Sequence, residues 1–263
     1  MDRVKMFLPL LLLAGGTFAW AEECIIAVSD GRIIRPSRIE VRGNGDLDYY
    51  MQPGKTPNRI ARGRYRYAQI PKPAAVSEAD QKLREQQWKS AAAMYRKAGN
   101  DYKLLGWQVY CIRMEAEALA RSGEKNLAEK ILTSLHDLHD SNPRQQRERQ
   151  LADNFLADLL IDRKQFDQAE KILDRQLRLE DQELVFSAFF KKAVILQGRG
   201  MRVPALRLFY QTALLFPGHP RRAEALYNTW NLLAELKDPR AVKIAEMLKR
   251  EYPDSQFAKQ VFF

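Results

Sequence analysis

The feature that most constrains the fold is an alanine that recurs at a nearly constant spacing along most of the chain. Its copies are Ala91, Ala128, Ala169, Ala205 and Ala241. The separations are 37, 41, 36 and 36 residues. A period of about 20 to 50 residues is the signature of a stacked repeat protein. One unit of that size cannot bury its apolar face alone, so the units share their stability with their neighbours.

Other positions recur together with this alanine, which makes a chance pattern untenable. One helical turn after it stand Tyr95, Leu132, Leu173, Phe209 and Ala245. Before the last four copies stand a small row and an apolar row: Ala116, Ala157, Ala193 and Thr229, then Leu119, Leu160, Leu196 and Leu232. A small residue lets two antiparallel helices approach closely, and a larger one fills the gap beside it. Each unit is therefore predicted to be a helical hairpin, with short turns at 121–126, 162–165, 198–203 and 235–240.

This pattern resembles the tetratricopeptide repeat (TPR), most clearly in FDQAEKILDRQL at 166–177 and MRVPALRLFYQTALLFPGHP at 201–220. The resemblance covers about residues 76–262. It implies a mainly α fold, a TPR-like α-solenoid of about five helical hairpins over residues 73–263. The last two units are similar to a bacterial envelope subfamily that includes the lipoprotein of the outer-membrane barrel-assembly machinery and the coordinator of the Tol-Pal system. The resemblance implies a non-catalytic scaffold or adaptor that mediates protein–protein interactions in the periplasm or at the outer membrane.

Several segments depart from the repeat pattern. The first unit has no clear turn, so Ser77 to Lys97 is predicted to be one long helix with Ser77 as its N-cap. The 41-residue step is predicted to contain a longer loop at 140–150. Unlike the envelope relatives, the chain has no N-terminal coiled coil. Glu22 and Glu23 precede Cys24, which excludes a lipid-anchor motif at that cysteine.

Before the repeats, residues 22–72 read as a small antiparallel β module. Strand-like runs alternate with the turn pairs Asp30-Gly31, Asn44-Gly45 and Pro53-Gly54. The predicted strands are Cys24–Val28, Arg32–Ile34, Arg38–Arg42, Leu47–Met51 and Arg64–Ile70. Their spacing resembles the Sm-like or SH3-like meanders and barrels. The segment 69–77, with two prolines, is expected to be a short stiff linker to the repeats.

Residues 1–21 have the order of an export signal: a basic start, an apolar run, and Ala19 and Ala21 around Trp20. The apolar stretch is 16 residues, shorter than the roughly 20 that span a bilayer as a helix. An uncleaved anchor is the alternative. Cleavage would change the formal charge from +10 to +9 and leave an exported protein without a transmembrane segment. Export permits a disulfide, but Cys24 and Cys111 are expected to be two thiols.

In TPR proteins the first helix of each unit lines a concave face that binds peptides or partner helices. Laid on this sequence, the resemblance places eight residues there: Tyr110, Arg113, Glu117, Asn154, Asp158, Phe190, Gln197 and Trp230. Aromatic anchors beside polar groups suit recognition of a protein or peptide. The alternative is that several of them are packing residues or solvated surface. No side-chain clamp for a free C-terminal carboxylate is visible.

A basic cluster in the β module supports a second hypothesis. Arg59, Arg62, Arg64 and Arg66 are interleaved with Tyr65 and Tyr67. Such alternation can bind nucleic acid, but it is also typical of a half-exposed strand, and an exported protein rarely meets nucleic acid. An anionic envelope surface or cell-wall polymer is the expected target. In that alternative the module carries the affinity and the repeats are a spacer.

The sequence contains few cysteine and histidine residues that could bind metals or act in catalysis, with only two cysteines and three histidines. His136 and His139 are three residues apart and could chelate a divalent ion, but a position near a helix end explains them as well. His219 is expected in a loop. No phosphate-binding Gly-rich loop and no nucleophile elbow is present. We therefore expect no cofactor, no metal site and no enzymatic activity.

Overall fold

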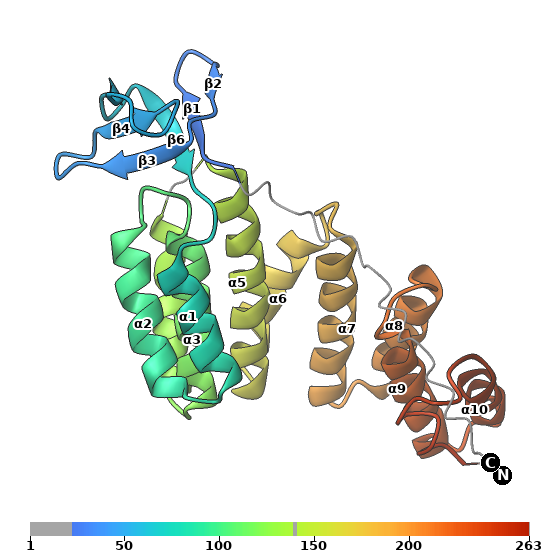
Figure 1. Cartoon of the computed structure of the whole chain (residues 1–263). Coiled ribbons are helices and arrows are strands. Elements are labelled where there is room, and N and C mark those ends of the chain that lie inside the picture. Colours follow the sequence, from blue (N-terminus) through green and yellow to red (C-terminus); the bar gives the residue numbers. More distant parts are fainter. Residues whose placement is uncertain (1–22, 139–140, 263) are drawn as a thin grey trace, which may run out of the picture. The chain divides into compact units, whose positions relative to one another are not determined.

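A computed structural model describes residues 23–138 and 141–262 (Figure 1). The expected export signal at 1–21 and His139 lie outside the described residues. The chain divides after Pro73 into two compact units, Met1–Pro73 and Ala74–Phe263. Their described parts are called the β module and the helical unit. Cys24 of the first and Cys111 of the second are both buried thiols.

The described β module contains six strands in two antiparallel three-stranded sheets. The strands are β1 (Ile25–Val28), β2 (Ile33–Ile34), β3 (Arg38–Val41), β4 (Leu47–Tyr50), β5 (Asn58–Ile60) and β6 (Tyr65–Gln69). One sheet has the order β2-β1-β6 and the other β3-β4-β5. The first sheet is not a simple meander, because the last strand pairs with the first. The sequence pattern missed β5, which has only three residues and two polar side chains.

The turns of the β module form where the Gly-containing pairs predicted them. Gly31 and Gly45 both have positive φ, at 95° and 85°. In each turn the glycine N–H donates to the carbonyl three residues earlier, that of Val28 and of Arg42 respectively. A non-glycine side chain rarely adopts this backbone conformation. Glycine therefore sets the register of these two hairpins, and the strands bury Leu47 at the centre of the module.

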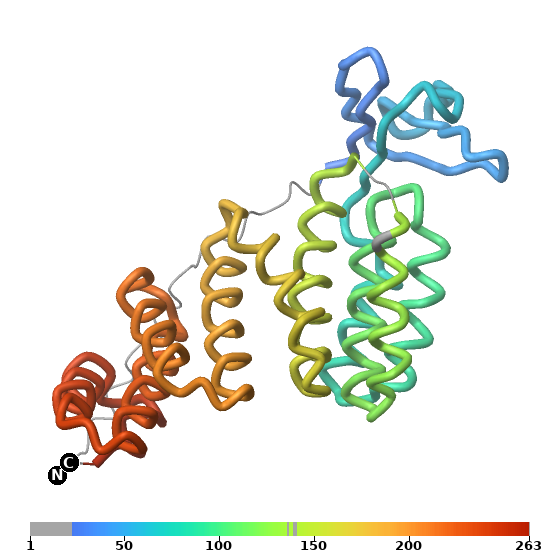
Figure 2. Tube along the Cα trace, turned by 180° about the vertical axis from the view of Figure 1, so that it is seen from behind, coloured from blue at the N-terminus to red at the C-terminus, as the bar shows by residue number. Residues whose placement is uncertain are grey.

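The described helical unit contains ten α-helices and one short 3₁₀-helix, which follow one another as hairpins (Figures 1 and 2). The first two hairpins and the 3₁₀ turn are α1 (Ala74–Arg84), α2 (Trp88–Asp101), α3 (Gln108–Arg121), α4 (Lys125–Ser134) and η1 (Leu135–Asp137). The others are α5 (Pro143–Asp162), α6 (Phe166–Gln176), α7 (Gln182–Gly198), α8 (Arg202–Leu215), α9 (Arg222–Glu235) and α10 (Arg240–Glu251). The prediction of about five hairpins after a small β module is confirmed.

The first repeat corrects one expectation from the sequence. Residues 77–97 are not one long helix, because the chain turns between α1 and α2 at Gln86, whose φ is +60°. Ser77 lies inside α1 and is no N-cap. Helix α1 also takes up the second half of the segment expected to be a linker. The turn was invisible in the sequence because a glutamine stands where glycine is usual.

All five hairpin turns use the same backbone motif. The residue with positive φ is Gln86, Gly123, Lys164, Gly200 or Lys237. Its N–H donates to the carbonyl three residues earlier, and the next N–H donates to the carbonyl five residues earlier, at 2.8–3.1 Å throughout. This is the Schellman closure of a helix, which satisfies carbonyls that would otherwise have no partner. The same turn geometry therefore recurs in all five hairpins, although three of the five turns lack glycine at the residue with positive φ.

We expect Gly200→Ala to lower the free energy of unfolding by about 1 kcal/mol. Its φ of +77° is strained for any side chain, although a Cβ there would meet no heavy atom within 4 Å. Gly218→Ala is the control, since it also meets nothing within 4 Å and has no positive φ. Urea denaturation followed by circular dichroism measures both. Equal losses in the two variants would contradict the turn argument.

The 41-residue step also differs from its prediction. Most of the segment 140–150 is helix, because α5 begins at Pro143 and runs for 20 residues. Asn142 caps it, its side-chain oxygen accepting the N–H of Arg144 at 2.9 Å. Proline at the first helical position is favourable because its missing N–H would have no partner there. The extra length therefore lies mainly in a longer helix.

The recurring rows form the core of the helical unit. The alanines of the first four copies are completely buried, as are the residues one turn later, such as Tyr95 and Phe209. In the last repeat the pattern shifts. Ala241 is only partly buried, and Ala245 takes the buried place. The self-similarity of the sequence thus reflects the packing of one helix on the next.

Candidate functional site

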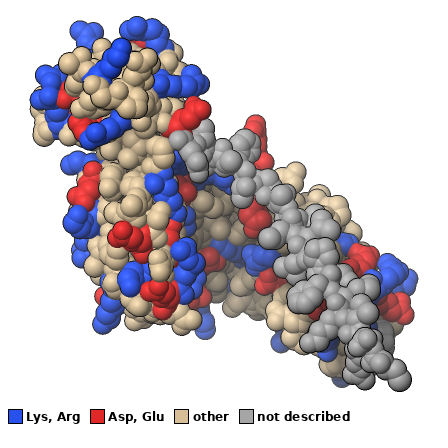
Figure 3. Space-filling view, in the orientation of Figure 1, with Lys and Arg blue, Asp and Glu red and all other residues tan. Residues whose placement is uncertain are grey.

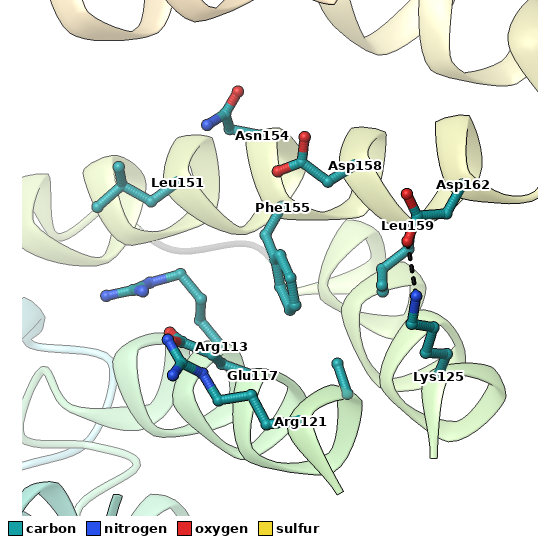
Figure 4. A pocket seen from close by; sticks show the side chains of 11 residues that line it. Arg113, Glu117, Arg121, Lys125, Leu151, Asn154, Phe155, Asp158, Leu159 and Asp162 are labelled. Atoms are coloured by element: carbon teal, nitrogen blue, oxygen red, sulfur yellow. Dashed lines mark hydrogen bonds and ion pairs between the residues drawn. The ribbon is translucent and has the colours of Figure 1, made fainter. Parts of the chain in front are cut away.

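A groove lies between α3 and α5, the first helices of two successive repeats. Its volume is about 490 Å³, and Figure 4 shows it from close by. The groove is lined by Arg113, Glu117, Ala120, Arg121, Lys125, Leu151, Asn154, Phe155, Asp158, Leu159 and Asp162. Four residues that the sequence assigned to the concave face are among them: Arg113, Glu117, Asn154 and Asp158. The structure therefore brings half of the predicted set to one site.

The helical period explains how the groove is built. On α5, Asn154, Asp158 and Asp162 are spaced by four residues and form one stripe, while Leu151, Phe155 and Leu159 form the adjacent stripe. In Figure 4 the Phe155 ring points from α5 into the space between the two helices. The apolar stripe thus forms the floor of the groove, and the polar stripe, which contains two aspartates, forms one edge.

The opposite edge of the groove belongs to α3 and the start of α4. Arg113, Glu117 and Arg121 again follow a spacing of four, and Lys125 continues the line. With three basic residues and one acidic residue, this edge has an excess of positive charge. The two edges of the groove therefore carry opposite charge, which can orient a bound chain.

These charges are already paired within the protein. Arg121 pairs with Glu117 at 2.7 Å, and Lys125 of α4 pairs with Asp162 of α5 at the same distance. Arg113 reaches across to Glu148 of α5 at 2.8 Å, and both of these side chains are mostly buried. Such pairs fix the spacing of α3 and α5. Because the exposed pairs are worth little, a ligand can exchange partners with them at small cost.

Asn154 and Asp158 also hold α5 to α7. The ammonium of Lys191, which is buried, contacts the Asn154 carbonyl at 2.6 Å, its side-chain oxygen at 2.9 Å and Asp158 at 2.8 Å. The Ser187 hydroxyl donates to the same amide oxygen at 3.0 Å. Burial lowers the pKa of Lys191, and Asp158 opposes that shift. One predicted binding residue, Asn154, thus also has a structural role in packing.

Tyr110 lies at the start of α3, outside the lining of the groove. Its hydroxyl donates to Asp80 of α1 at 2.8 Å, and the guanidinium of Arg113 lies 5.4 Å from its ring centre. Burial raises the pKa of Tyr110, and the nearby Asp80 carboxylate raises it further. Tyr110 therefore supports Arg113 from behind and joins the first two repeats.

Phe190 and Trp230 are corrections to the predicted concave face. They are 6% and 4% exposed and belong to the core of the last two repeats. The Arg221 guanidinium covers the ring of Phe190 at 4.7 Å, and Phe262 covers Trp230 at a ring distance of 5.2 Å. A partner cannot reach them without displacing these neighbours. Gln197 is half-buried near the end of α7, and the groove lining does not include it.

His219 lies in the predicted loop, between α8 and α9, but its ring is buried. It stacks on Phe186 with 3.6 Å between ring centres. Its Nδ1 accepts the N–H of Arg221 at 3.1 Å, so the proton is on Nε2, which donates to Glu183 at 2.8 Å. His219 is therefore a packing residue that joins the fourth repeat to the fifth.

Sequence reasoning missed Phe155, the apolar anchor of the groove. The available signal was the spacing of Leu151, Phe155 and Leu159, an apolar stripe next to the polar stripe of Asn154 and Asp158. Arg121 and Lys125 were missed because they flank the turn between α3 and α4, where register from one repeat to the next is least certain. Once α3 and α5 are known to be in contact, the helical period identifies both the apolar and the polar stripe of α5.

The predicted arginine cluster lies on the surface of the β module, where Figure 3 shows many basic side chains. Arg59, Arg62, Arg64 and Arg66 are all exposed. Arg59 is held by Asp48 at 2.8 Å, and the backbone N–H of Arg62 donates to Asp46 at 2.9 Å. Arg59 and Arg62 therefore have partners within the β module, and all four arginines are exposed to solvent.

Within residues 23–138 and 141–262, no group of three or more histidine, cysteine or carboxylate side chains is placed to hold a metal ion. The pair His136 and His139 is not included, since His139 lies outside this range. None of the helices in this range combines the length and the apolar character that a membrane span requires.

Comparison with known proteins gives a likeness in structure only. No protein-family model matches the sequence. Among curated proteins there is no match either. Solved structures do match; the three described below are less than 20% identical to this chain, and identity at that level informs about the fold alone.

Three of the matching structures illustrate the range. BtubC (BKLC) from P. vanneervenii has a TM-score of 0.56 and 17% identity, covering 65% of this chain and 76% of its own. A putative kinesin light chain of Podosopora anserina, with nearly identical TPR-like repeats, has a TM-score of 0.54 and 16% identity, covering 70% and 95%. YrrB, a TPR protein with an unusual peptide-binding site, has a TM-score of 0.46 and 19% identity, covering 70% and 88%. From the two likenesses with TM-scores above 0.5, the helical unit has the fold of a TPR-like α-solenoid.

Proposed function

We propose that the protein is a non-catalytic adaptor that binds a peptide segment of another protein in the groove between α3 and α5. The observation that carries this proposal is the combination of an apolar floor around Phe155 with two edges of opposite charge. Buried aromatic anchors with a polar rim are the usual composition of protein-binding sites.

The arrangement of the groove favours a segment with an apolar anchor for the floor. Acidic side chains of the segment would face Arg113, Arg121 and Lys125, and basic ones would face Asp158 and Asp162. The edges set orientation more than affinity, because their charges are solvated or already paired. Most of the affinity is then expected from contacts with the floor.

We further propose that the adaptor works in the bacterial periplasm or at the outer membrane. This rests on the signal-like residues 1–21 and on the similarity of the last two repeats to an envelope subfamily. Fractionation of cells that express the chain with a C-terminal tag tests it. Recovery in the cytoplasm, with residues 1–21 still attached, would contradict it.

A substitution that fills the groove tests the binding site. Ala120 lines the groove on α3, and Ala120→Arg adds a long side chain without removing any packing. We expect it to reduce capture of partner proteins from an envelope extract at least tenfold, since the floor contacts carry most of the affinity. Quantitative mass spectrometry of material bound to the immobilised chain, residues 22–263, measures the loss.

Ala93→Arg is the matched control, because Ala93 is exposed on α2 and the chemical change is identical. It should retain the proteins that Ala120→Arg loses. Circular dichroism spectra confirm that both variants are folded. If both variants capture the same proteins as the wild type, the α3–α5 groove is not the binding site.

A further inference from the structure

The β module holds a disproportionate share of the positive charge. Residues 23–73 contain ten basic and five acidic residues, so this short unit carries +5, while the much longer helical unit carries the same. Eight of the ten basic residues are arginine. Arginine presents a planar fork of N–H donors that matches phosphate oxygens, whereas lysine is a point charge.

Two of these arginines are held side by side by one buried carboxylate. Arg42 donates from Nε to Asp48 Oδ2 at 2.6 Å, and its Nη2 lies 2.6 Å from the same oxygen. Arg59 donates from Nε to Asp48 Oδ1 at 2.8 Å. The side chain of Asp48 is 8% exposed, but those of Arg42 and Arg59 are 48% and 53% exposed. We call this group the Arg42–Asp48–Arg59 clamp.

The clamp is fixed by the sheet. Asp48 of β4 lies directly opposite Arg59 of β5, and Arg42 follows β3 on the other side of β4. The two arginines lower the pKa of Asp48 to about 2. The carboxylate therefore stays ionised near neutral pH, and each guanidinium keeps N–H groups that Asp48 does not use.

A third arginine, Arg62, lies next to the clamp. Asp46 accepts the backbone N–H of Arg62 at 2.9 Å, and the Arg62 side chain lies over Gly45, where a Cβ would come within 2.8 Å of it. The turn between β3 and β4 thus packs on the turn that carries Arg62 and Arg64. Three arginines, Arg42, Arg59 and Arg62, therefore interact with the two aspartates, and the local charge remains positive.

Such an arrangement of like charges needs an explanation beyond folding. Two guanidinium groups repel each other, and one carboxylate compensates only one of them. A phosphate group on the solvent side would supply the missing negative charge and accept from both forks. Apolar side chains are also exposed beside the same strands: Val41 next to Arg42, and Met51 after β4. Exposed apolar groups among arginines suit a lipid surface better than a soluble polyanion.

We propose that the Arg42–Asp48–Arg59 clamp, extended by Arg62, binds phosphate headgroups of an anionic phospholipid surface. This goes beyond the adaptor function, because the site lies in the β module and needs no contact with the α3–α5 groove. The adaptor would then act at a membrane surface to which its β module binds. Either proposal can fail while the other stands.

The test is sedimentation of the chain, residues 22–263, with vesicles of phosphatidylcholine alone or mixed with phosphatidylglycerol. The deciding variant is Asp48→Asn, which raises the net charge by one but removes the carboxylate that orients the clamp. An unspecific electrostatic surface would bind the mixed vesicles more tightly after this change. The clamp predicts binding about fivefold weaker, the contribution of roughly one basic side chain at a membrane surface.

Asp30→Asn is the matched control. Asp30 forms an exposed pair with Arg32 in another turn of the β module, so the charge change is the same and the clamp stays intact. It should bind the mixed vesicles at least as well as the wild type. Thermal unfolding followed by circular dichroism verifies that both variants are folded.

A second variant keeps the proposal testable if Asp48→Asn does not fold. The double substitution Arg42→Lys and Arg59→Lys preserves every charge but replaces the planar forks, and it should also weaken binding about fivefold. Unchanged binding by this variant would overturn the proposal. If the wild-type chain binds pure phosphatidylcholine vesicles as well as the mixed vesicles, the proposal is also overturned. The same holds if a DNA oligonucleotide displaces the chain from the mixed vesicles at a phosphate concentration below that of the lipid.

Discussion

Replacing Phe186 by alanine is expected to lower the free energy of unfolding by about 4 kcal/mol, a value typical of a fully buried phenylalanine. Phe186 has no exposed surface and lies in the core of the last two repeats. Its ring contacts Phe216 edge-on at 5.6 Å and His219 face-on at 3.6 Å. Truncation would leave a cavity between α7 and the loop before α9.

A second layer of contacts also depends on the Phe186 ring. His219 stacks on Phe186 while hydrogen-bonded to Glu183 and to the backbone of Arg221. The Arg221 guanidinium lies 5.8 Å from the centre of the Phe186 ring. Without the ring, these polar groups would lose the surface that positions them. The fourth and fifth repeats would then be coupled less strongly.

Phe189→Ala is the matched control, since Phe189 lies on the same helix but is only partly buried. We expect it to cost about 1 kcal/mol, in proportion to the smaller apolar area removed from water. Urea denaturation monitored at 222 nm compares the two variants with the wild type. Equal destabilisation would show that Phe186 has no special place in the core.

The repeat and its core could be predicted from the sequence because they depend on local spacing. A buried small residue and a larger one a turn later, such as Ala169 and Leu173, must recur wherever the same helices pack. The turn of the first repeat could not be predicted in this way. Gln86 adopts a conformation that usually requires glycine, and it is stabilised by backbone hydrogen bonds that leave no mark on the side chains.

The candidate site was predictable only in part, since equivalent positions change character along the solenoid. Phe190 stands one repeat after Asn154 in the same register, but it packs in the core instead of facing the groove. Arg221, before α9, and Phe262, in the C-terminal tail, cover Phe190 and Trp230 in the last repeats. Such coverage by segments outside the repeat has no periodic signal, so a pattern of spacing cannot reveal it.

Replacing Asp80 by alanine is the second substitution for which we expect a large effect, about 3 kcal/mol. Asp80 of α1 is buried and accepts the hydroxyl of Tyr95 of α2 at 2.6 Å and that of Tyr110 of α3 at 2.8 Å. The variant would remove this acceptor from the buried hydroxyl of Tyr95 and the partly buried hydroxyl of Tyr110, at a cost of about 1 to 3 kcal/mol for each group left unsatisfied.

A background without the two hydroxyls tests whether the hydrogen bonds carry this energy. In a chain with Tyr95→Phe and Tyr110→Phe, Asp80→Ala should cost at least 2 kcal/mol less than in the wild type, because no donor is orphaned. Asp80→Asn in the wild-type background keeps an acceptor oxygen and should cost less than alanine. Because each repeat contacts only its neighbours, faster amide hydrogen exchange should be confined to α1–α3. An equal cost of Asp80→Ala in both backgrounds would assign the effect to lost packing instead of these hydrogen bonds. A loss of exchange protection that extends to α8–α10 would assign it to global unfolding.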